Sequence, residues 1–244
     1  PNLTVEEHAD TTAPVISDVI LNLDLGRLSI LFSETIDVSP GYRVNVSDLA
    51  LVDDATGESK ILFYLVKSRL GTVVDALRVN ITLDPFERVG AVANSSFLDG
   101  SPLKLQANAV AHDVAFNYNI NPALINITEI PDLSPIVTVN ASVDFNDGTV
   151  TIFFSEPVDI TPLSLINTSR IFLVNKTGDN QISNYRSTKV AGVDHFNLTL
   201  KLHEDDRVHL ITLSGTQGGD NTPILMDVYS GAVQDIATNV NLDN

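Results

Sequence analysis

The sequence predicts an all-β protein made of two tandem antiparallel β-sandwich modules, and three observations support this. Residues 28–38 recur as residues 150–160, with identical or chemically similar residues at every position, so one structural unit has been duplicated at an offset of 122. Short alternating apolar and polar segments follow one another at roughly 8 to 12 residue intervals, separated by turn residues, which is typical of a sandwich. No long segment has the period of an amphipathic helix.

The repeated segment is the central strand of each module. Leu28, Ile30 and Phe32 recur at every second position, with Ser29 between the first two, which predicts a strand with one buried face. We expect this strand to end at Glu34 in the first module and at Glu156 in the second, where Pro157 cannot continue a central ladder. The two glutamates lie in different modules, so we interpret them as turn residues and not as an acid–base pair, which must flank one bond.

The other elements follow in chain order and recur in the second module. In the first module we expect strands at residues 15–23, 42–52, 61–66, 76–83, 89–93 and 103–107, and a closing segment at residues 113–119. The closing segment recurs at residues 235–241.

Three short motifs carry a family resemblance. They are Ala-Pro-Val-Ile-Ser at residues 13–17, the Phe-Ser-Glu strand ends, and the closing Asp-[Val/Ile]-Ala-x-Asn. Together they resemble the tandem immunoglobulin-like repeats of large surface and S-layer-type proteins. The resemblance covers both modules and implies an immunoglobulin-like fold with a structural role, without catalytic residues. The family's closing Ala-Gly-Asn is changed here, because Phe116 and Thr238 replace the glycine.

The module boundaries indicate a displaced strand. We divide the chain into an N-terminal strand and linker at residues 1–13, a first module at 14–130 and a second module at 131–244. Pro1 lies 121 residues before Pro122, as linker residue Pro14 lies 121 before Pro135, so residues 1–9 correspond to the strand that ends the first module. The second module's own copy of that strand would begin at Asn244. The predicted assembly residues are Asn2, Leu3, Thr4 and Val5, with their internal counterparts Leu124, Ile125, Ile127 and Ile130.

A sandwich that lacks an edge strand leaves backbone groups unpaired and an apolar groove open to an incoming strand. Two arrangements fit this expectation. Either the chain is one part of a longer covalent array, or separate copies join head to tail, the first residues of one completing the second module of the next. Both are heterologous contacts that produce a fibre.

Composition excludes several partners. The chain has 31 acidic and 14 basic residues and a formal charge of −17, which repels nucleic acid and anionic membrane surfaces. The longest apolar run, residues 61–66, is too short to span a membrane.

Asparagine sequons indicate a secreted or cell-surface protein. The chain has no cysteine. Nine Asn-x-Ser/Thr triplets are present, against about three expected by chance, so we expect N-linked glycans. The sequon residues are Asn2, Asn45, Asn80, Asn94, Asn126, Asn140, Asn167, Asn175 and Asn197.

The sequence predicts no enzyme, cofactor or metal centre. The five histidines lack metal-ligand spacing, and no nucleophile elbow or phosphate-binding glycine loop is present. The clustered acidic residues that calcium would use are Asp53, Asp54 and Glu58, and Asp205 with Asp206, although no EF-hand loop surrounds them.

The leading hypothesis is therefore a structural subunit or repeat segment of a heavily glycosylated extracellular or cell-surface fibre, whose partners are copies of itself. The alternative is an adhesin stalk or carbohydrate-binding surface module, which predicts exposed aromatic residues at one end of a sandwich; aromatic residues are only 6% of the chain. A glycan-processing hydrolase would instead need a cleft with convergent carboxylates.

Overall fold

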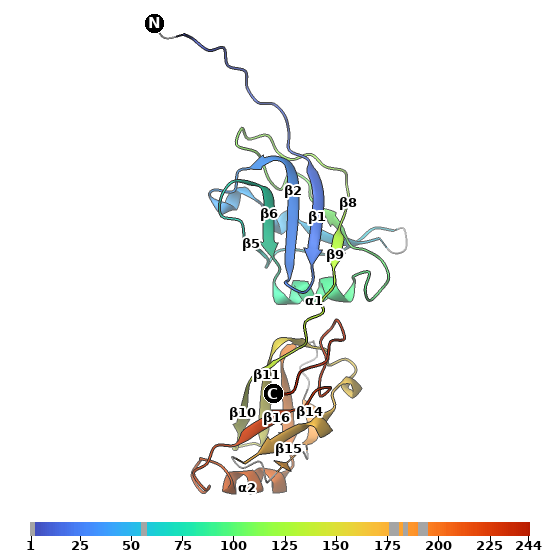
Figure 1. The fold of residues 1–244 in the computed structure, drawn as a ribbon. Coiled ribbons are helices and arrows are strands. Elements are labelled where there is room, and N and C mark those ends of the chain that lie inside the picture. The colour runs from blue at the N-terminus through green and yellow to red at the C-terminus, as the bar shows by residue number, and fades with distance from the viewer. Residues whose placement is uncertain (1–2, 55–57, 176–180, 183–184, 190–194) are drawn as a thin grey trace. The chain divides into compact units, whose positions relative to one another are not determined.

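The computed structural model describes residues 3–54, 58–175, 181–182, 185–189 and 195–244. The chain forms two compact units, Pro1–Asp132 (unit 1) and Leu133–Asn244 (unit 2) (Figure 1). Both are mostly β, with two sheets and one short α-helix in each unit. The predicted boundary was at residue 130.

Unit 1 contains a five-stranded and a four-stranded sheet. The first has the order β5 (Arg69–Leu70), β6 (Ala76–Thr82), β2 (Arg27–Ile36), β1 (Ile16–Asn22) and β9 (Thr128–Ile130). The second has the order β4 (Lys60–Tyr64), β3 (Ala50–Asp53), β7 (Lys104–Gln106) and β8 (Ile125–Asn126). The helix α1 (Pro85–Ala93) and the 3-10 turns Gly41–Arg43 and Val46–Asp48 complete the unit.

Unit 2 repeats this order without counterparts of β8 and β9 among its described residues. One sheet has the order β10 (Thr138–Asp144), β11 (Thr149–Val158), β15 (His195–Leu202) and β14 (Tyr185–Lys189). The other has the order β13 (Gln181–Ile182), β12 (Ile171–Val174) and β16 (Leu225–Val228). The helix α2 (Glu204–Thr212) and the 3-10 turns Leu163–Leu165 and Thr168–Arg170 connect these strands.

Each core is formed by the inward residues of the predicted period-2 strands. Leu28 and Ile30 of β2 are 0% and 1% exposed, as the alternation predicted. In unit 2 one apolar cluster joins both sheets, with Val150 and Ile152 from β11 and Leu173 from β12. The two sheets of unit 2 therefore share a single core.

The expected strand at residues 89–93 is wrong, because this segment belongs to α1. Asp84 caps the helix by accepting a hydrogen bond from the amide of Phe86, and Pro85 occupies the first turn, where its missing N–H is not needed. Ala91 and Val92 then bury one face of only nine residues. A helix this short gives little periodic signal, and α2 was missed for the same reason.

The central strands are longer than predicted. β2 continues through Glu34 to Ile36, and β11 continues through Pro157 to Val158. The ladder between β11 and β15 shifts register between Phe153 and Val158. Pro157 lies within this irregularity, so its missing N–H interrupts no regular ladder bond.

Matched hydrogen bonds establish the repeat offset in the structure. The amide of Val15 donates to Ser33 Oγ over 2.9 Å, and the amide of Val137 donates to Ser155 Oγ over 3.0 Å. Val15 and Val137 are 122 residues apart, as are Ser33 and Ser155, and this is the offset of the central strand.

The same offset holds in the linkers and corrects the predicted alignment of the prolines. The amide of Ile120 donates to Pro14 O, and the amide of Leu242 donates to Ile136 O. Pro14 is therefore equivalent to Ile136 and not to Pro135. The displacement of 121 that links the prolines is one residue short of the structural register.

Within the described ranges, α1 and α2 are nine residues each, and no helix combines the length and apolarity that a membrane crossing needs.

Candidate functional site: an open groove in unit 2

The segment at residues 125–130 closes both sheets of unit 1. β8 pairs antiparallel with β7, joining Ile125 to Leu105, and β9 pairs parallel with β1, joining Glu129 to Leu21 (Figure 1). Ile127 lies at the crossing between the two sheets and is only 6% exposed. The segment therefore supplies an edge to each sheet and an apolar plug between them.

Polar contacts anchor this segment in one register. The Glu129 carboxylate accepts hydrogen bonds from Ser96 N at 2.9 Å, Ser96 Oγ at 2.6 Å and Leu103 N at 2.7 Å. At the end of the segment, Arg88 of α1 forms an ion pair with Asp132, whose side chain is 4% exposed. Charge-assisted bonds of this kind fix position more strongly than neutral ones.

Unit 2 has a groove where unit 1 has this segment. β10 and β16 take the places of β1 and β7, and each is the outer strand of its sheet among the described residues. A cavity of about 460 Å³ lies along them. It is lined by β10 residues 138–143, Phe145, Leu173, residues 214–216, residues 223–226 and Asn244.

Burial at matched positions shows what the groove lacks. Leu105 pairs with Leu51 in unit 1, as Met226 pairs with Leu173 in unit 2, so Leu105 and Met226 are counterparts. Leu105 is fully buried, whereas Met226 is only half-buried. Leu225, beside Met226, is 45% exposed. The apolar wall that β8 and β9 cover in unit 1 is open in unit 2.

The side chain of Asn244 forms hydrogen bonds with the backbone of β16 at the rim of the groove. Asn244 accepts a hydrogen bond from Val228 N at 2.5 Å through Oδ1 and donates to Met226 O at 3.2 Å through Nδ2. These bonds lie on the edge of β16 that faces away from β12. At the other wall, Thr138 Oγ1 is buried without a hydrogen-bond partner.

An arginine holds the glycine hairpin in each unit. Gly26 and Gly148 have φ values of +58° and +75°, and a Cβ on either would lie about 3 Å from the Cδ of Arg88 or Arg207. Arg88 Nε donates to Leu23 O at 2.5 Å in unit 1. Arg207 is the counterpart of Arg88 in unit 2.

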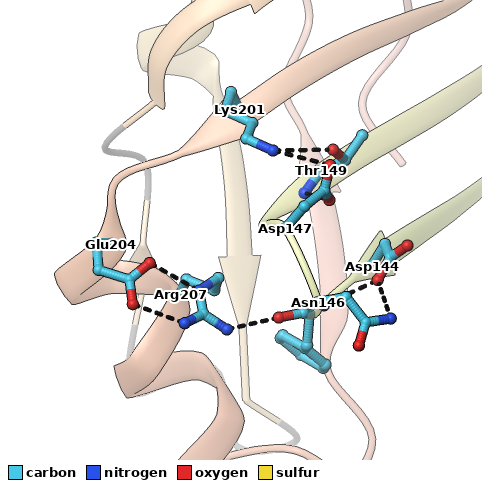
Figure 2. A network of polar contacts seen from close by, with 8 residues as sticks. Asp144, Asn146, Asp147, Thr149, Lys201, Glu204 and Arg207 are labelled. Atoms are coloured by element: carbon cyan, nitrogen blue, oxygen red, sulfur yellow. Dashed lines mark hydrogen bonds and ion pairs between the residues drawn. The ribbon is translucent and has the colours of Figure 1, made fainter.

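In unit 2 this arginine belongs to a network at the hairpin (Figure 2). Arg207 donates to Phe145 O at 2.6 Å and makes two bonds to Glu204, at 2.6 and 2.8 Å. Beside it, the hydrogen bond from Thr149 and that from Lys201 lower the pKa of Asp147 to about 2. Arg207 is therefore paired on its own helix, whereas Arg88 is paired with the strand-end residue Asp132.

Three carboxylates meet in unit 1 where the sequence suggested only turn residues. Ligand oxygens of Asp10, Glu34 and Asp113 lie within 4.8 Å of one another, close enough to share one cation. Partial burial raises the pKa of Glu34, and the nearby charges of Asp10 and Asp113 raise it further. The signal that sequence reasoning missed is that all three recur as acids at the 122-residue offset.

The acids proposed from the sequence as calcium ligands lie elsewhere. Among the described residues they form no group of three carboxylates. Asp54 pairs with Lys104 over 2.5 Å and accepts from Ser59, and the bond from Lys104 lowers the pKa of Asp54. Asp205 is exposed in the first turn of α2. The remaining predicted acids are Asp53, Glu58 and Asp206.

The sequon asparagines differ in exposure. The exposed ones are Asn45, Asn126, Asn140 and Asn167. The half-buried ones are Asn80, Asn94, Asn175 and Asn197, and Asn2 lies outside the described residues. The glycan-bearing nitrogen of Asn94 donates to Gly90 O at 2.8 Å. The predicted assembly residues Leu3 and Val5 are 93% and 79% exposed, and the described residues before Ile16 form no strand.

An aromatic cluster lies at the closing turn of unit 1. Phe116 and Tyr118 are 65% and 57% exposed, and their ring centroids lie 5.2 and 5.3 Å from that of His112. The guanidinium of Arg43 lies 5.9 Å from the Phe116 centroid. Sequence reasoning placed most aromatic residues in strands and did not anticipate this exposed group.

No protein-family model and no curated protein matches the chain. One similar solved structure is the N-terminal part of the bacterial S-layer protein SbsC, with a TM-score of 0.31 and 11% identity over 79% of this chain. The chain spans 45% of the length of that structure. Another is bovine butyrophilin, with a TM-score of 0.19 and 8% identity, covering 78% of this chain and 83% of that one.

Proposed function

We propose that this chain is a structural segment of an N-glycosylated extracellular or cell-surface fibre. Its two units are immunoglobulin-like sandwiches, and copies join head to tail when a β-strand from one copy completes unit 2 of the next. The proposal includes no enzymatic activity and no resident cofactor.

The observation that carries this proposal is the groove between β10 and β16. Unit 1 provides an internal template, because the same place is filled there by β8, Ile127 and β9. An apolar groove flanked by the outer edges of two strands favours a strand as its occupant, since main-chain hydrogen bonds and alternate side chains are then both satisfied. The incoming strand would displace the Asn244 side chain from Met226 O. The exposed residues 3–9 match the segment at residues 125–130 in sequence pattern and form no strand in the described chain.

The direct test compares the purified chain with a form that lacks residues 1–9. We expect the full chain to form filaments in electron microscopy and to grow in mass with concentration in light scattering, also in excess chelator. The deletion should stay monomeric yet folded, because Leu3 and Val5 make little contact with unit 1. Filaments from the deletion form would contradict strand donation by these residues.

Glycosylation needs its own measurement on native material. Intact mass before and after glycosidase treatment gives the total glycan, and peptide mapping gives the occupied asparagines. We expect glycan at Asn126, Asn140 and Asn167, which are exposed, and lower occupancy at Asn94, which is half-buried and whose amide nitrogen is hydrogen-bonded. Asn45 should be intermediate, because it is exposed but its amide nitrogen donates to Asp48.

The aromatic cluster favours a second candidate function, a carbohydrate-binding or adhesin module. Exposed rings beside an arginine are suited to stacking on a sugar face. Binding of a glycan array by the native chain, lost in the Phe116→Ala and Tyr118→Ala variants, would support this candidate. Such binding is compatible with a role in a fibre.

A further inference from the structure

If copies join as proposed above, the segment at residues 125–132 of unit 1 also predicts the register in which the incoming strand docks. At the structural offset of 122, Ile125, Ile127, Glu129 and Asp132 correspond to Leu3, Val5, Glu7 and Asp10. We propose that residues 3–10 of a second copy dock in the groove of unit 2 in this register, and that Glu7 and Asp10 specify it.

The apolar positions set which side of the strand faces inward. Leu3 would pair with Met226 as Ile125 pairs with Leu105, and Val5 would take the place of the buried Ile127. The alignment of the prolines, whose offset is 121, would instead place Glu6 at the position of Ile127. A one-residue slip moves every side chain of a strand to the opposite face, so only one of these registers buries apolar groups.

Unit 2 has counterparts of the two backbone amides that donate to Glu129, but not of the Ser96 hydroxyl. Glu129 accepts from the amides of Ser96 and Leu103 in unit 1. Ser95 and Ser214 are counterparts, because the hydroxyl of each donates to the carbonyl three residues earlier at the end of α1 or α2. The residue that follows Ser214 is Gly215, which therefore matches Ser96.

The second donor follows from the strand pairing. Leu103 precedes β7 as Ile224 precedes β16. Gly215 and Ile224 both line the groove. Within the described residues, no hydrogen-bond acceptor from unit 2 reaches either amide. Two backbone donors thus point to a carboxylate at the position where Glu7 would lie.

Asp10 would meet Arg207 as Asp132 meets Arg88. Both arginines hold a glycine hairpin, but Arg207 is bound by Glu204 of its own helix, and the matching position of α1 is Pro85. Docking would exchange Glu204 for the incoming Asp10. Charge also favours this contact, because Asp10 lies in a cluster with two other carboxylates, which a cation from the next copy would offset.

The test measures the binding of a fluorescent peptide of residues 1–13 to the chain that lacks residues 1–9. Glu7→Gln in the peptide should weaken binding about tenfold or more, since hydrogen bonds to a charged group are the strong ones. Asp10→Asn should weaken it about three- to tenfold, because the ion pair is partly exposed. Glu6→Gln is the matched control; it removes the same charge from the opposite face and should change binding less than about twofold.

A cycle with the acceptor isolates the second contact. Arg207→Met in the protein should weaken the wild-type peptide about as much as Asp10→Asn does, and the two changes together should cost no more than either alone. Additive losses would show that Asp10 and Arg207 do not meet.

The outcomes separate the register from the function. If Glu6→Gln weakens binding and Glu7→Gln does not, the shorter register is correct and this inference is overturned. If the peptide binds and neither Glu7→Gln nor Asp10→Asn weakens binding, strand completion stands. The proposal that Glu7 and Asp10 specify the register is then wrong. If no peptide binds and the full chain stays monomeric in light scattering, the proposed function itself fails.

Discussion

Units 1 and 2 share a hairpin, a helix and a closing turn in the same register, but they differ at one edge. In unit 1, residues 125–130 cover both sheets, and Leu21, Leu105 and Ile127 are buried. In unit 2, the counterparts Val143 and Met226 are only half-buried and line an open groove. The comparison teaches that the segment at residues 125–130 decides whether this edge of the fold is covered or open.

The largest expected effect comes from covering the groove of unit 2 with the segment that covers the same edge of unit 1. Asn244 corresponds to Pro122, so residues 123–132 appended directly after it would mirror unit 1. We expect the free energy of unfolding of unit 2 to rise, because the copies of Ile125 and Ile127 would be buried against Val143 and Met226 and the segment would add a strand to each sheet. Hydrogen exchange with mass spectrometry measures unit 2 separately.

The control for this extension carries serine at the copies of Ile125 and Ile127. It should leave unit 2 as open as before, and the chain should still bind the peptide of residues 1–13. The active extension should block that binding. Stabilisation without loss of peptide binding would mean that the appended residues stabilise unit 2 from outside the groove.

The matched core positions give the next largest effect. Leu105→Ala should destabilise unit 1 by about 3 kcal/mol, since it removes a fully buried leucine. Met226→Ala should cost unit 2 only about 1 kcal/mol, since its side chain is partly solvated. Chemical denaturation of each variant, followed by exchange in each unit, checks the contrast. Equal costs would mean that the groove is closed in solution.

Sequence patterns predicted what depends on local alternation and repetition. The duplication and the buried face of β2 follow from residues that alternate along one strand, and Leu28 and Ile30 are buried as expected. The groove was expected from the order of the segments. The prolines gave an alignment that was one residue short, because Pro14 and Pro135 need only lie in the linker and are not bound to one backbone position.

What the sequence did not predict depends on contacts between distant segments. The helix α1 is nine residues long and begins at a capped proline, so its signal lies in the cap and not in periodicity. The cluster of Asp10, Glu34 and Asp113 joins a linker, a strand and a closing turn. No single stretch of sequence contains it, although its repetition at the same offset could have revealed it.

The two hairpin arginines should differ in their contribution to stability. Arg88→Met leaves Asp132, whose side chain is 4% exposed, without its ion-pair partner, and should destabilise unit 1 by about 2–3 kcal/mol. Arg207→Met leaves Glu204, whose side chain is 63% exposed, and should destabilise unit 2 less than Arg88→Met destabilises unit 1. Thermal unfolding of the two variants measures this. The reverse order would contradict the assignment of Arg88 as the residue that anchors Asp132 in unit 1.

The closing turns allow a smaller comparison. Phe116 and Thr238 have φ values of +68° and +71°, in the left-handed region that favours glycine. Thr238→Gly should stabilise unit 2 by about 0.5–1 kcal/mol, because a β-branched residue is strained there. Phe116→Gly should give no gain, since it also removes the ring contact with His112. Equal gains in both units would show that the aromatic contact contributes nothing.

The last comparison concerns the pH dependence of stability. The pKa of Asp147 in unit 2 is lowered, whereas the pKa of Glu34 in unit 1 is raised. The bonds from Thr149 and Lys201 lower the pKa of Asp147 from 3.8 to about 2, so its stabilising contribution is complete above pH 3.8 and is lost as the pH falls towards 2. Partial burial, Asp10 and Asp113 raise the pKa of Glu34 above 4.5, so its ionised form destabilises unit 1 above that raised pKa, and the penalty disappears below pH 4.5.

Asp147→Asn should therefore destabilise unit 2 at pH 7, and its difference from the native chain should vanish near pH 2. Glu34→Gln should stabilise unit 1 at pH 7, and its difference should vanish below pH 4.5, a higher pH than for Asp147. Thermal unfolding across this range in low salt, in the presence of chelator, measures both curves. If Glu34→Gln destabilises unit 1 at pH 7, the carboxylate makes favourable contacts that outweigh its repulsion by Asp10 and Asp113. The cluster of Asp10, Glu34 and Asp113 would then stabilise unit 1. Pairing of Asp10 with Arg207 of a neighbouring copy would then relieve less charge repulsion.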